Sequence, residues 1–196
     1  MKKATGVRYG NQQIKLHLGC GTNLPKGWTN IDNNYDKNIN LKKLDLNWDL
    51  TKELPYKNDS VDKIFHEHFI EHLEKPAGEK FLRECYRLLK PGGVMRLGWP
   101  DMALLIRAYA TRDKKYFSYI EKNVFWGMKY QLWDELVSDY FYSWDHRYAY
   151  SKKHMQTLLE DIGFKNIKTK KFQQSDYGFD IDVRNDCATT YLEAQK

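Results

Sequence analysis

Glycine, acidic and histidine residues stand just after four short apolar segments in the first third of the chain. They are Gly19-Cys20-Gly21, Asp32, Asp45 and His66-Glu67-His68. Glycine allows a backbone to approach a ligand closely, and a carboxylate accepts hydrogen bonds from two neighbouring hydroxyl groups. One glycine turn, or one acid after a strand, is usually only a turn or a cap. Four such features in this order indicate a nucleotide-type ligand, with Asp32 on a ribose and Asp45 near an adenine amino group.

The elements that must hold these residues are predicted from the apolar pattern. Strands are expected at Ile14–Cys20, Trp28–Asp32, Lys43–Leu46, Val61–His66, Val94–Trp99, Ile167–Phe172 and Ala188–Glu193, with a turn at Lys90–Gly93. Helices are expected at His68–Leu89, Asp101–Tyr109 and Ser151–Ile162, the first broken near Lys75 because Pro76 and Gly78 follow. The alternation predicts a doubly wound α/β sheet of about seven strands, mostly parallel, with an antiparallel C-terminal edge hairpin. In such a sheet, ligands lie beyond the carboxyl ends of the strands.

The glycine turn is not that of a dinucleotide site. A dinucleotide fold has GxGxxG opening a helix, whereas Gly21 is followed by TNLPKG, with no third glycine in register and no room for a helix. A P-loop is excluded because the chain has no GxxxxGK[ST] motif. The segment Thr22–Gly27 is short for a connection between parallel strands, because such a crossover ordinarily takes about 12 residues.

The chain resembles the Rossmann-like S-adenosylmethionine-dependent methyltransferases. The resemblance rests on LHLGCG, on Asp32, on LDL, and on the segments SVDKIFHEHFIEHL, LRECYRLLKPGGVMRL and HRYAYSKKHMQTLLEDIGFKNIK. It implies a Rossmann-like methyltransferase sheet with a shortened first crossover. In style the chain is similar to small methyltransferases of sugar and polysaccharide gene clusters, and also to the methyltransferase domain of chlorovirus enzymes that cap glycans.

The resemblance implies a role for each matching residue, with S-adenosylmethionine as the cofactor. Gly19, Cys20 and Gly21 would lie under the methionine moiety and the ribose. Asp32 would hold the ribose, Asp45 and Leu46 the adenine, and the backbone of His66 and Glu67 the methionine amine. His17 departs from the family pattern, which often has an acid there to help hold the amine.

Methyl transfer to a hydroxyl group needs a base, and three residues are candidates for that role. They are His68 after the fourth strand, Asp101 after the fifth and His146 before the last helix. Histidine suits this chemistry because it titrates near neutral pH. The alternatives are that His68 only packs and that Asp101 only caps its helix. Trp99, Arg147 and Tyr148 are candidates for binding a polar acceptor.

His68 and His72 are spaced i, i+4, as in some metal sites. No third ligand is evident in the sequence, and His72 is expected to be structural. The sequence therefore predicts a metal-independent enzyme.

An aromatic-rich segment separates the fifth strand from the last helix. Eleven Tyr, Phe and Trp residues fall within Asp113–Trp144: Tyr116, Phe117, Tyr119, Phe125, Trp126, Tyr130, Trp133, Tyr140, Phe141, Tyr142 and Trp144. Residues 110–148 would form an insert or lid within one methyltransferase domain of residues 1–196. Its aromatic side chains either pack together or bind the acceptor, because aromatic faces pack well on sugar rings.

Composition limits the partners and the compartment. The net charge is +6, but the lysines are scattered rather than gathered into one basic stripe, which argues against a nucleic-acid partner. Three widely spaced cysteines suggest a reducing compartment. No apolar run approaches the roughly 20 residues of a membrane span, and no signal peptide opens the sequence. A cytoplasmic location is expected.

The function predicted from these features is O-methylation of a sugar hydroxyl on a glycan or polysaccharide. Alternatives are an RNA or small-molecule methyltransferase, and a non-catalytic cofactor-binding partner of a glycosyltransferase. A glycosyltransferase partner or fused domain is a further expectation. The chain has His66-Glu67-His68-Phe69 where base-amine methyltransferases usually carry [N/D]PP[Y/F], which counts against a nucleic-acid base as acceptor.

Overall fold

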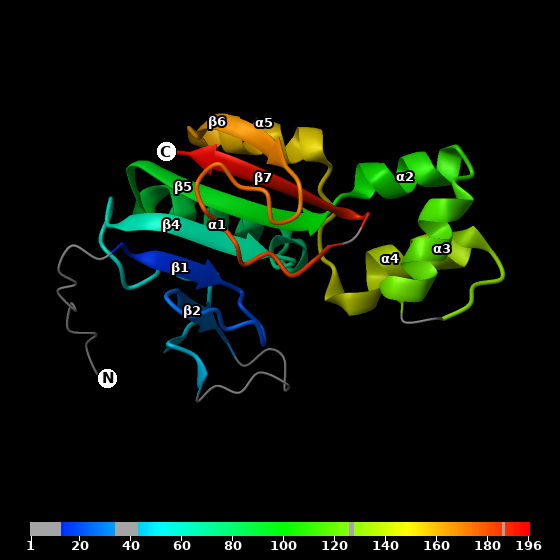
Figure 1. Ribbon diagram of the computed structural model, residues 1–196, viewed down its shortest axis with the longest axis horizontal. Coiled ribbons are helices and arrows are strands. Elements are labelled where there is room, and N and C mark those ends of the chain that lie inside the picture. The colour runs from blue at the N-terminus through cyan, green and yellow to red at the C-terminus, as the bar shows by residue number, and fades with distance from the viewer. Residues whose placement is uncertain (1–12, 34–42, 126–127, 186) are drawn as a thin grey trace.

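A seven-stranded sheet runs through the computed structural model, which describes residues 13–33, 43–125, 128–185 and 187–196. Figure 1 shows the sheet, whose strand order is β3-β2-β1-β4-β5-β7-β6. The strands are β1 (Lys15–Leu18), β2 (Thr29–Asp32), β3 (Leu46–Asn47), β4 (Val61–Glu67), β5 (Leu89–Pro100), β6 (Lys165–Lys170) and β7 (Thr189–Gln195). The first five strands are parallel, and β7 runs antiparallel between β5 and β6. The predicted α/β sheet with an antiparallel C-terminal hairpin is confirmed.

The predicted turn at Lys90–Gly93 is wrong in one respect, because these residues belong to β5. The end of the chain pairs with them. The Gly92 amide donates to the Lys196 carbonyl, and the Lys196 amide donates to the Gly93 carbonyl, both at 3.0 Å. A contact with the last residue of the chain could not be read from the local pattern.

Helices α1 (Lys75–Leu88) and α5 (Lys152–Ile162) cover one face of the sheet (Figure 1). The predicted break before α1 is confirmed, because a 3₁₀ helix, Ile70–His72, precedes it and Pro76 lies in the first turn of α1, where a missing amide is tolerated. Ser151 caps α5 by accepting from the His154 amide, and Gly163 ends it at φ 117°. The main apolar core lies between these two helices and the sheet.

The opposite face of the sheet is covered by the loop 171–185, which Figure 1 shows crossing in front of the strands. Phe179 and Ile181 of this loop pack against Trp28 and Phe65. The ring centroids of Trp28 and Phe179 are 5.6 Å apart. This second, smaller core holds the loop on the sheet.

The short first crossover is explained by the short strands that it joins. Thr29, the first residue of β2, pairs with Leu16 of β1, so residues 19–28 return only to the level of Leu16. An extended chain spans about 3.3 Å per residue, which makes a helix unnecessary for so short a return. Trp28 anchors the end of the crossover in the second core.

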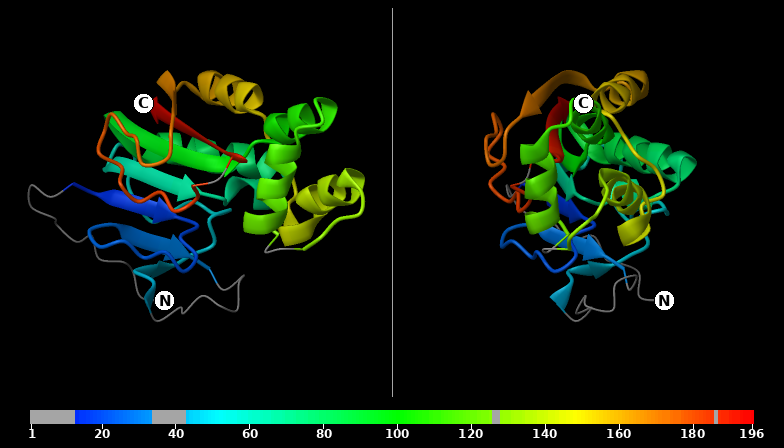
Figure 2. Two further views of the ribbon diagram at one scale, coloured as in Figure 1. Left: turned by 45° about the vertical axis from the view of Figure 1, so that its right-hand side comes forward. Right: turned by 90° about the vertical axis from the view of Figure 1, so that its right-hand side faces the viewer.

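Three helices stand beyond the carboxyl ends of the strands (Figures 1 and 2). They are α2 (Met102–Ala110), α3 (Lys114–Asn123) and α4 (Trp133–Tyr142). They share an apolar core of their own, in which the Phe117 and Trp133 rings stack at 4.2 Å. Much of the aromatic-rich insert is therefore packing, while Trp126 lies outside the described residues. No described helix is long and apolar enough to cross a membrane.

Candidate functional site

A cavity of about 950 Å³ lies at the carboxyl ends of the parallel strands, bordered by α3 and α4. This volume is typical of small-molecule sites. Its lining includes the glycine turn with Asp32, residues 49–51, most of residues 68–73, Pro100, residues of the helical insert between 123 and 146, and Arg184 with Ala188. The cavity therefore joins the predicted cofactor end to the predicted acceptor end.

The glycine turn forms one wall of the cavity, and both glycines have positive φ. A Cβ atom on Gly19 (φ +66°) would lie 2.5 Å from Cδ2 of Phe69, which also lines the cavity. A Cβ on Gly21 (φ +52°) would meet no atom within 4 Å. The backbone at Gly21 is thus open to a ligand, as the predicted cofactor floor requires.

Asp32 lies beside the glycine turn and lines the cavity. Its Oδ2 accepts from the Gly21 amide at 2.7 Å, and its Oδ1 accepts from the Asn33 amide at 2.7 Å. Hydrogen bonds from these two amides fix the orientation of the carboxylate at the cavity wall.

Asp45 is turned away from the cavity lining. Its Oδ2 accepts from the Asn30 amide at 2.8 Å and from the Asn30 side chain at 3.1 Å, which ties it to β2. Neither Asp45 nor Leu46 is among the residues that line the cavity; Asp49, Leu50 and Thr51 line it instead. These three follow β3 and were missed by sequence reasoning, although they lie just beyond the LDL motif.

The side chains of His17, Cys20 and His66 are buried in the sheet rather than among the cavity-lining residues. The His17 ring packs on Phe65 at 5.0 Å, and burial lowers its pKa to about 4. The His66 ring packs on Phe81 at 5.1 Å, and burial lowers its pKa to about 3. Burial raises the pKa of the Cys20 thiol to about 12. Both imidazoles are therefore neutral at physiological pH.

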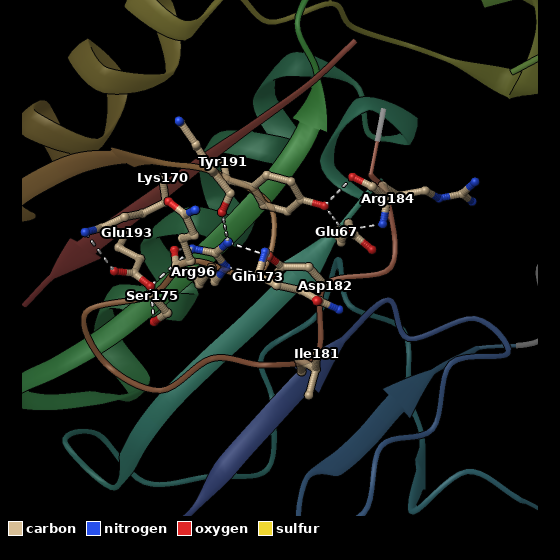
Figure 3. Close-up of polar contacts among 12 residues, drawn as sticks. Glu67, Arg96, Lys170, Gln173, Ser175, Ile181, Asp182, Arg184, Tyr191 and Glu193 are labelled. Atoms are coloured by element: carbon tan, nitrogen blue, oxygen red, sulfur yellow. Dashed lines mark hydrogen bonds and ion pairs between the residues drawn. The ribbon is translucent and has the colours of Figure 1, made fainter. Parts of the chain in front are cut away.

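Glu67 fastens the loop 171–185 to the end of β4, as Figure 3 shows. Its carboxylate accepts from the backbone amides of Val183 and Arg184 at 3.1 Å and from the Tyr191 hydroxyl. Burial raises the pKa of this carboxyl group, and the three donors oppose that shift. The Glu67 side chain thus has a structural task, which leaves its backbone for the predicted amine contact.

Two of the three base candidates line the cavity. His68, at φ +49°, has Nε2 2.7 Å from the Thr189 hydroxyl, and burial lowers its pKa to about 3. His146 donates from Nδ1 to the Tyr140 carbonyl at 2.9 Å, and burial lowers its pKa to about 4. The structure brings both histidines to the wall of the same cavity.

Asp101, the third base candidate, is not among the lining residues. Its Oδ1 caps α2 by accepting from the Ala103 amide at 3.0 Å, and its Oδ2 accepts from the Thr190 hydroxyl at 2.9 Å. This is the capping alternative that its position after Pro100 suggested.

The three candidates for acceptor binding do not line the cavity either. Trp99 lies in the main core and donates from Nε1 to the Tyr150 carbonyl at 3.2 Å. Tyr148 packs on Tyr150 at 4.8 Å. Arg147 has an exposed side chain, and its amide donates to the Glu71 carbonyl at 2.7 Å. The aromatic residues that do line the cavity include Phe69, Phe125, Tyr140 and Trp144.

Glu71 is a further cavity residue that sequence reasoning missed, and His72, which was expected to be structural, also lines the cavity. The Glu71 side chain is 2% exposed, 3.5 Å from Nδ1 of His68 and 3.9 Å from Nε2 of His72. Burial raises its pKa to about 8. The available signal was a second acid–histidine pair, Glu71-His72, which follows His66-Glu67-His68 after two apolar residues.

Part of the chain matches a known protein family. Residues 16–97 match the family described as "Methyltransferase domain". That segment includes the glycine turn, Asp32 and the cavity residues 68–73. No curated protein matches the chain.

Solved structures share the fold at low sequence identity. A methyltransferase from Archaeoglobus fulgidus has a TM-score of 0.58 at 16% identity, over 95% of this chain and 87% of that one. A methyltransferase from Thermotoga maritima has a TM-score of 0.58 at 19% identity, over 93% and 81%. Phosphoethanolamine N-methyltransferase 2 of Haemonchus contortus, in complex with S-adenosyl-L-methionine, has a TM-score of 0.56 at 13% identity, over 94% and 48%.

The fold, the cavity and the sequence match all point to the same class of protein. The chain has the Rossmann-like methyltransferase fold, and residues 16–97 carry the sequence of a methyltransferase domain. These findings support an S-adenosylmethionine-dependent methyltransferase with S-adenosylmethionine as its cofactor.

Proposed function

We propose that this protein transfers a methyl group from S-adenosylmethionine to a hydroxyl oxygen of a sugar, on a glycan or polysaccharide. The observation that carries the proposal is the composition of the single cavity described above. The ribose-binding candidate Asp32 lines the same cavity as His68, His146 and several aromatic side chains. Such a mixture of aromatic faces and polar groups suits a ring bearing hydroxyl groups.

The cofactor, when bound, supplies an electrophilic methyl group on a sulfonium ion. This chain contributes position and a proton acceptor. The glycine turn and Asp32 hold the adenosyl end, and the insert residues Tyr140 and Trp144 orient the acceptor. His68, whose neutral ring lines the cavity, would accept the proton that the acceptor hydroxyl loses when the methyl group is transferred to its oxygen.

The acceptor class is tested with the purified chain, methyl-labelled cofactor and a panel of oligosaccharides, nucleosides and small amines. We expect label in sugar methyl ethers, identified by mass spectrometry after hydrolysis. Label found only in nucleosides or amines would replace the sugar with that class of acceptor. Absence of transfer to every member, with the cofactor bound, would favour the non-catalytic alternative.

The cofactor end is tested by Asp32→Ala. Loss of the carboxylate removes two charge-assisted hydrogen bonds to ribose hydroxyls, so affinity for S-adenosylmethionine should fall by about 100-fold or more in calorimetry. Asp161→Ala is the matched control, because Asp161 is exposed on α5, away from the cavity. Equal affinity in both variants would overturn the ribose assignment.

A further inference from the structure

Glu71, His72 and His146 form a cluster at the wall of the cavity. Each offers one ligand atom, and these three atoms lie within 4.8 Å of one another. Glu71 and His72 come from the 3₁₀ helix that follows β4, whereas His146 comes from the segment between α4 and α5. The two imidazole rings are 5.2 Å apart.

The Glu71 side chain is an unusual buried carboxylate. Both of its side-chain oxygens are buried, and neither has a hydrogen-bond partner in the described residues. Burial of a carboxylate without partners is costly unless the group is neutralised or meets a cation. Arg184 exerts a favourable field on Glu71, but it makes no hydrogen bond to these oxygens. A bound cation would supply the missing partner.

A hydrogen bond holds His146 in the orientation of a metal ligand, and His72 faces Glu71. The Nδ1 of His146 donates to the Tyr140 carbonyl, because a carbonyl oxygen can only accept, and this leaves the Nε2 lone pair free to bind. Metal-bound histidines commonly use their second nitrogen for such a hydrogen bond. The Nε2 atom of His72 lies 3.9 Å from Oε1 of Glu71.

We propose that Glu71, His72 and His146 bind one divalent transition-metal ion, for which Zn²⁺ is the best match, with an open coordination position toward the cavity. Two histidines and a carboxylate form a donor set of catalytic zinc sites. Metal–ligand bonds of about 2.1 Å place tetrahedral ligand atoms about 3.4 Å apart, so the side chains draw together around the ion. The proposal replaces the expectation of a metal-independent enzyme, which rested on the lack of a third ligand.

The open position gives the ion a task in methyl transfer, and this part rests on the proposed function. A sugar hydroxyl bound there loses its proton more readily, because the ion stabilises the developing alkoxide. The proton passes to His68, which lies beside Glu71.

Metal binding is tested on the full chain after treatment with a chelator. Titration with Co²⁺, a spectroscopic substitute for Zn²⁺, should give one equivalent and a visible absorption band of a low-coordinate nitrogen–oxygen site. Calorimetry with Zn²⁺ should give the same stoichiometry. Glu71→Gln and His146→Asn should each weaken binding by at least tenfold, while His154→Asn should not, because His154 lies on α5 against Tyr148 and Tyr150.

Folding of the variants is checked by thermal unfolding without metal. Glu71→Gln should match or exceed the unmodified chain there and should lose the stabilisation that Zn²⁺ confers. Absence of saturable binding would overturn the proposal, as would equal affinity in the two ligand variants and the His154 control.

The proposed sugar acceptor and the proposed metal site can be tested independently of each other. Sugar methylation without metal binding would sink the metal site alone. Metal binding without sugar methylation would sink the proposed acceptor alone. If both hold, removal of the metal should lower kcat while cofactor affinity, measured by calorimetry, stays unchanged.

Discussion

The two glycines of the turn before β2 are held by different constraints. A side chain at Gly19 would meet the Phe69 ring at 2.5 Å, whereas one at Gly21 would meet only open space. Both residues have positive φ, which costs an alanine about 1 kcal/mol. Packing therefore restricts Gly19, and under the proposed function the approach of the cofactor restricts Gly21.

This difference predicts that alanine at Gly19 mainly lowers stability, whereas alanine at Gly21 mainly weakens cofactor binding. Gly19→Ala should lower the free energy of unfolding by about 2–4 kcal/mol, because strain and overlap add. Gly21→Ala should cost about 1 kcal/mol in stability, yet it should weaken S-adenosylmethionine binding, because its methyl group enters the cavity. Chemical denaturation and calorimetry measure the two effects. Equal loss of stability in both variants would contradict the contact with Phe69.

At the scale of elements, the loop 171–185 is fastened to the sheet by a buried charge cluster (Figure 3). Arg96 of β5 is fully buried and pairs with Asp182 of the loop and Glu193 of β7. Its guanidinium also donates to the carbonyls of Lys171 at 3.0 Å and Gln174 at 3.2 Å. One side chain thus holds both ends of the loop that covers this face.

Removal of Arg96 should loosen this loop. Arg96→Met leaves two buried carboxylates without their shared cation, and we expect a loss of about 3–5 kcal/mol in the free energy of unfolding. Lys168→Met is the control, because Lys168 forms an exposed pair with Asp176 that contributes little to stability. Hydrogen exchange in residues 171–185 should rise only in the Arg96 variant; unchanged exchange there would contradict the anchoring role.

At the scale of the whole molecule, buried histidines couple stability to pH. Burial lowers the pKa of His17 to about 4 and of His66 to about 3, from 6.5. Below pH 6.5 the two imidazoles bind protons in the unfolded chain but stay neutral in the folded chain. The favourable contribution of His17 and His66 to the free energy of unfolding is therefore fully present above pH 6.5. It is lost as the pH falls toward their pKa values in the folded chain.

The expected slope is about 1.4 kcal/mol per pH unit for each such histidine below pH 6.5. His66→Leu should flatten the profile of unfolding free energy between about pH 6 and pH 4. His154→Leu, which changes a partly exposed residue on α5, serves as the control. Parallel profiles for the unmodified chain and His66→Leu would show that His66 is not the buried neutral group described above.

Local patterns predicted the parts of the fold that depend on near neighbours. The Ser151 cap and Gly163 end of α5, the start of α1 next to Pro76 and the glycine turn at Gly19 all follow from a few adjacent residues. The same holds for the order of the strands and of α1, α2 and α5, because burial of an apolar strand or helix face leaves a periodic signal in the sequence. Helices α3 and α4 of the aromatic-rich insert were not predicted.

Side-chain partners were harder to predict. Asp101 and Asp45 both follow strands, where cavity residues are expected. Asp101 instead accepts from the Ala103 amide at the start of α2, and Asp45 accepts from the Asn30 amide. A strand end shows where the chain turns, but the direction of the side chain depends on the register and on the donors that neighbouring strands bring. Trp99 is in the core for the same reason.

The sequence by itself determined that a glycine turn, an acid after β2 and a histidine-rich segment after β4 meet at one edge of a parallel sheet, since strand direction alone brings carboxyl ends together. Only the tertiary structure decided that His146 faces Glu71 and His72, and that the insert helices pack on one another beside the cavity. Those contacts join residues far apart in the chain, where no local periodicity records which side chains will meet.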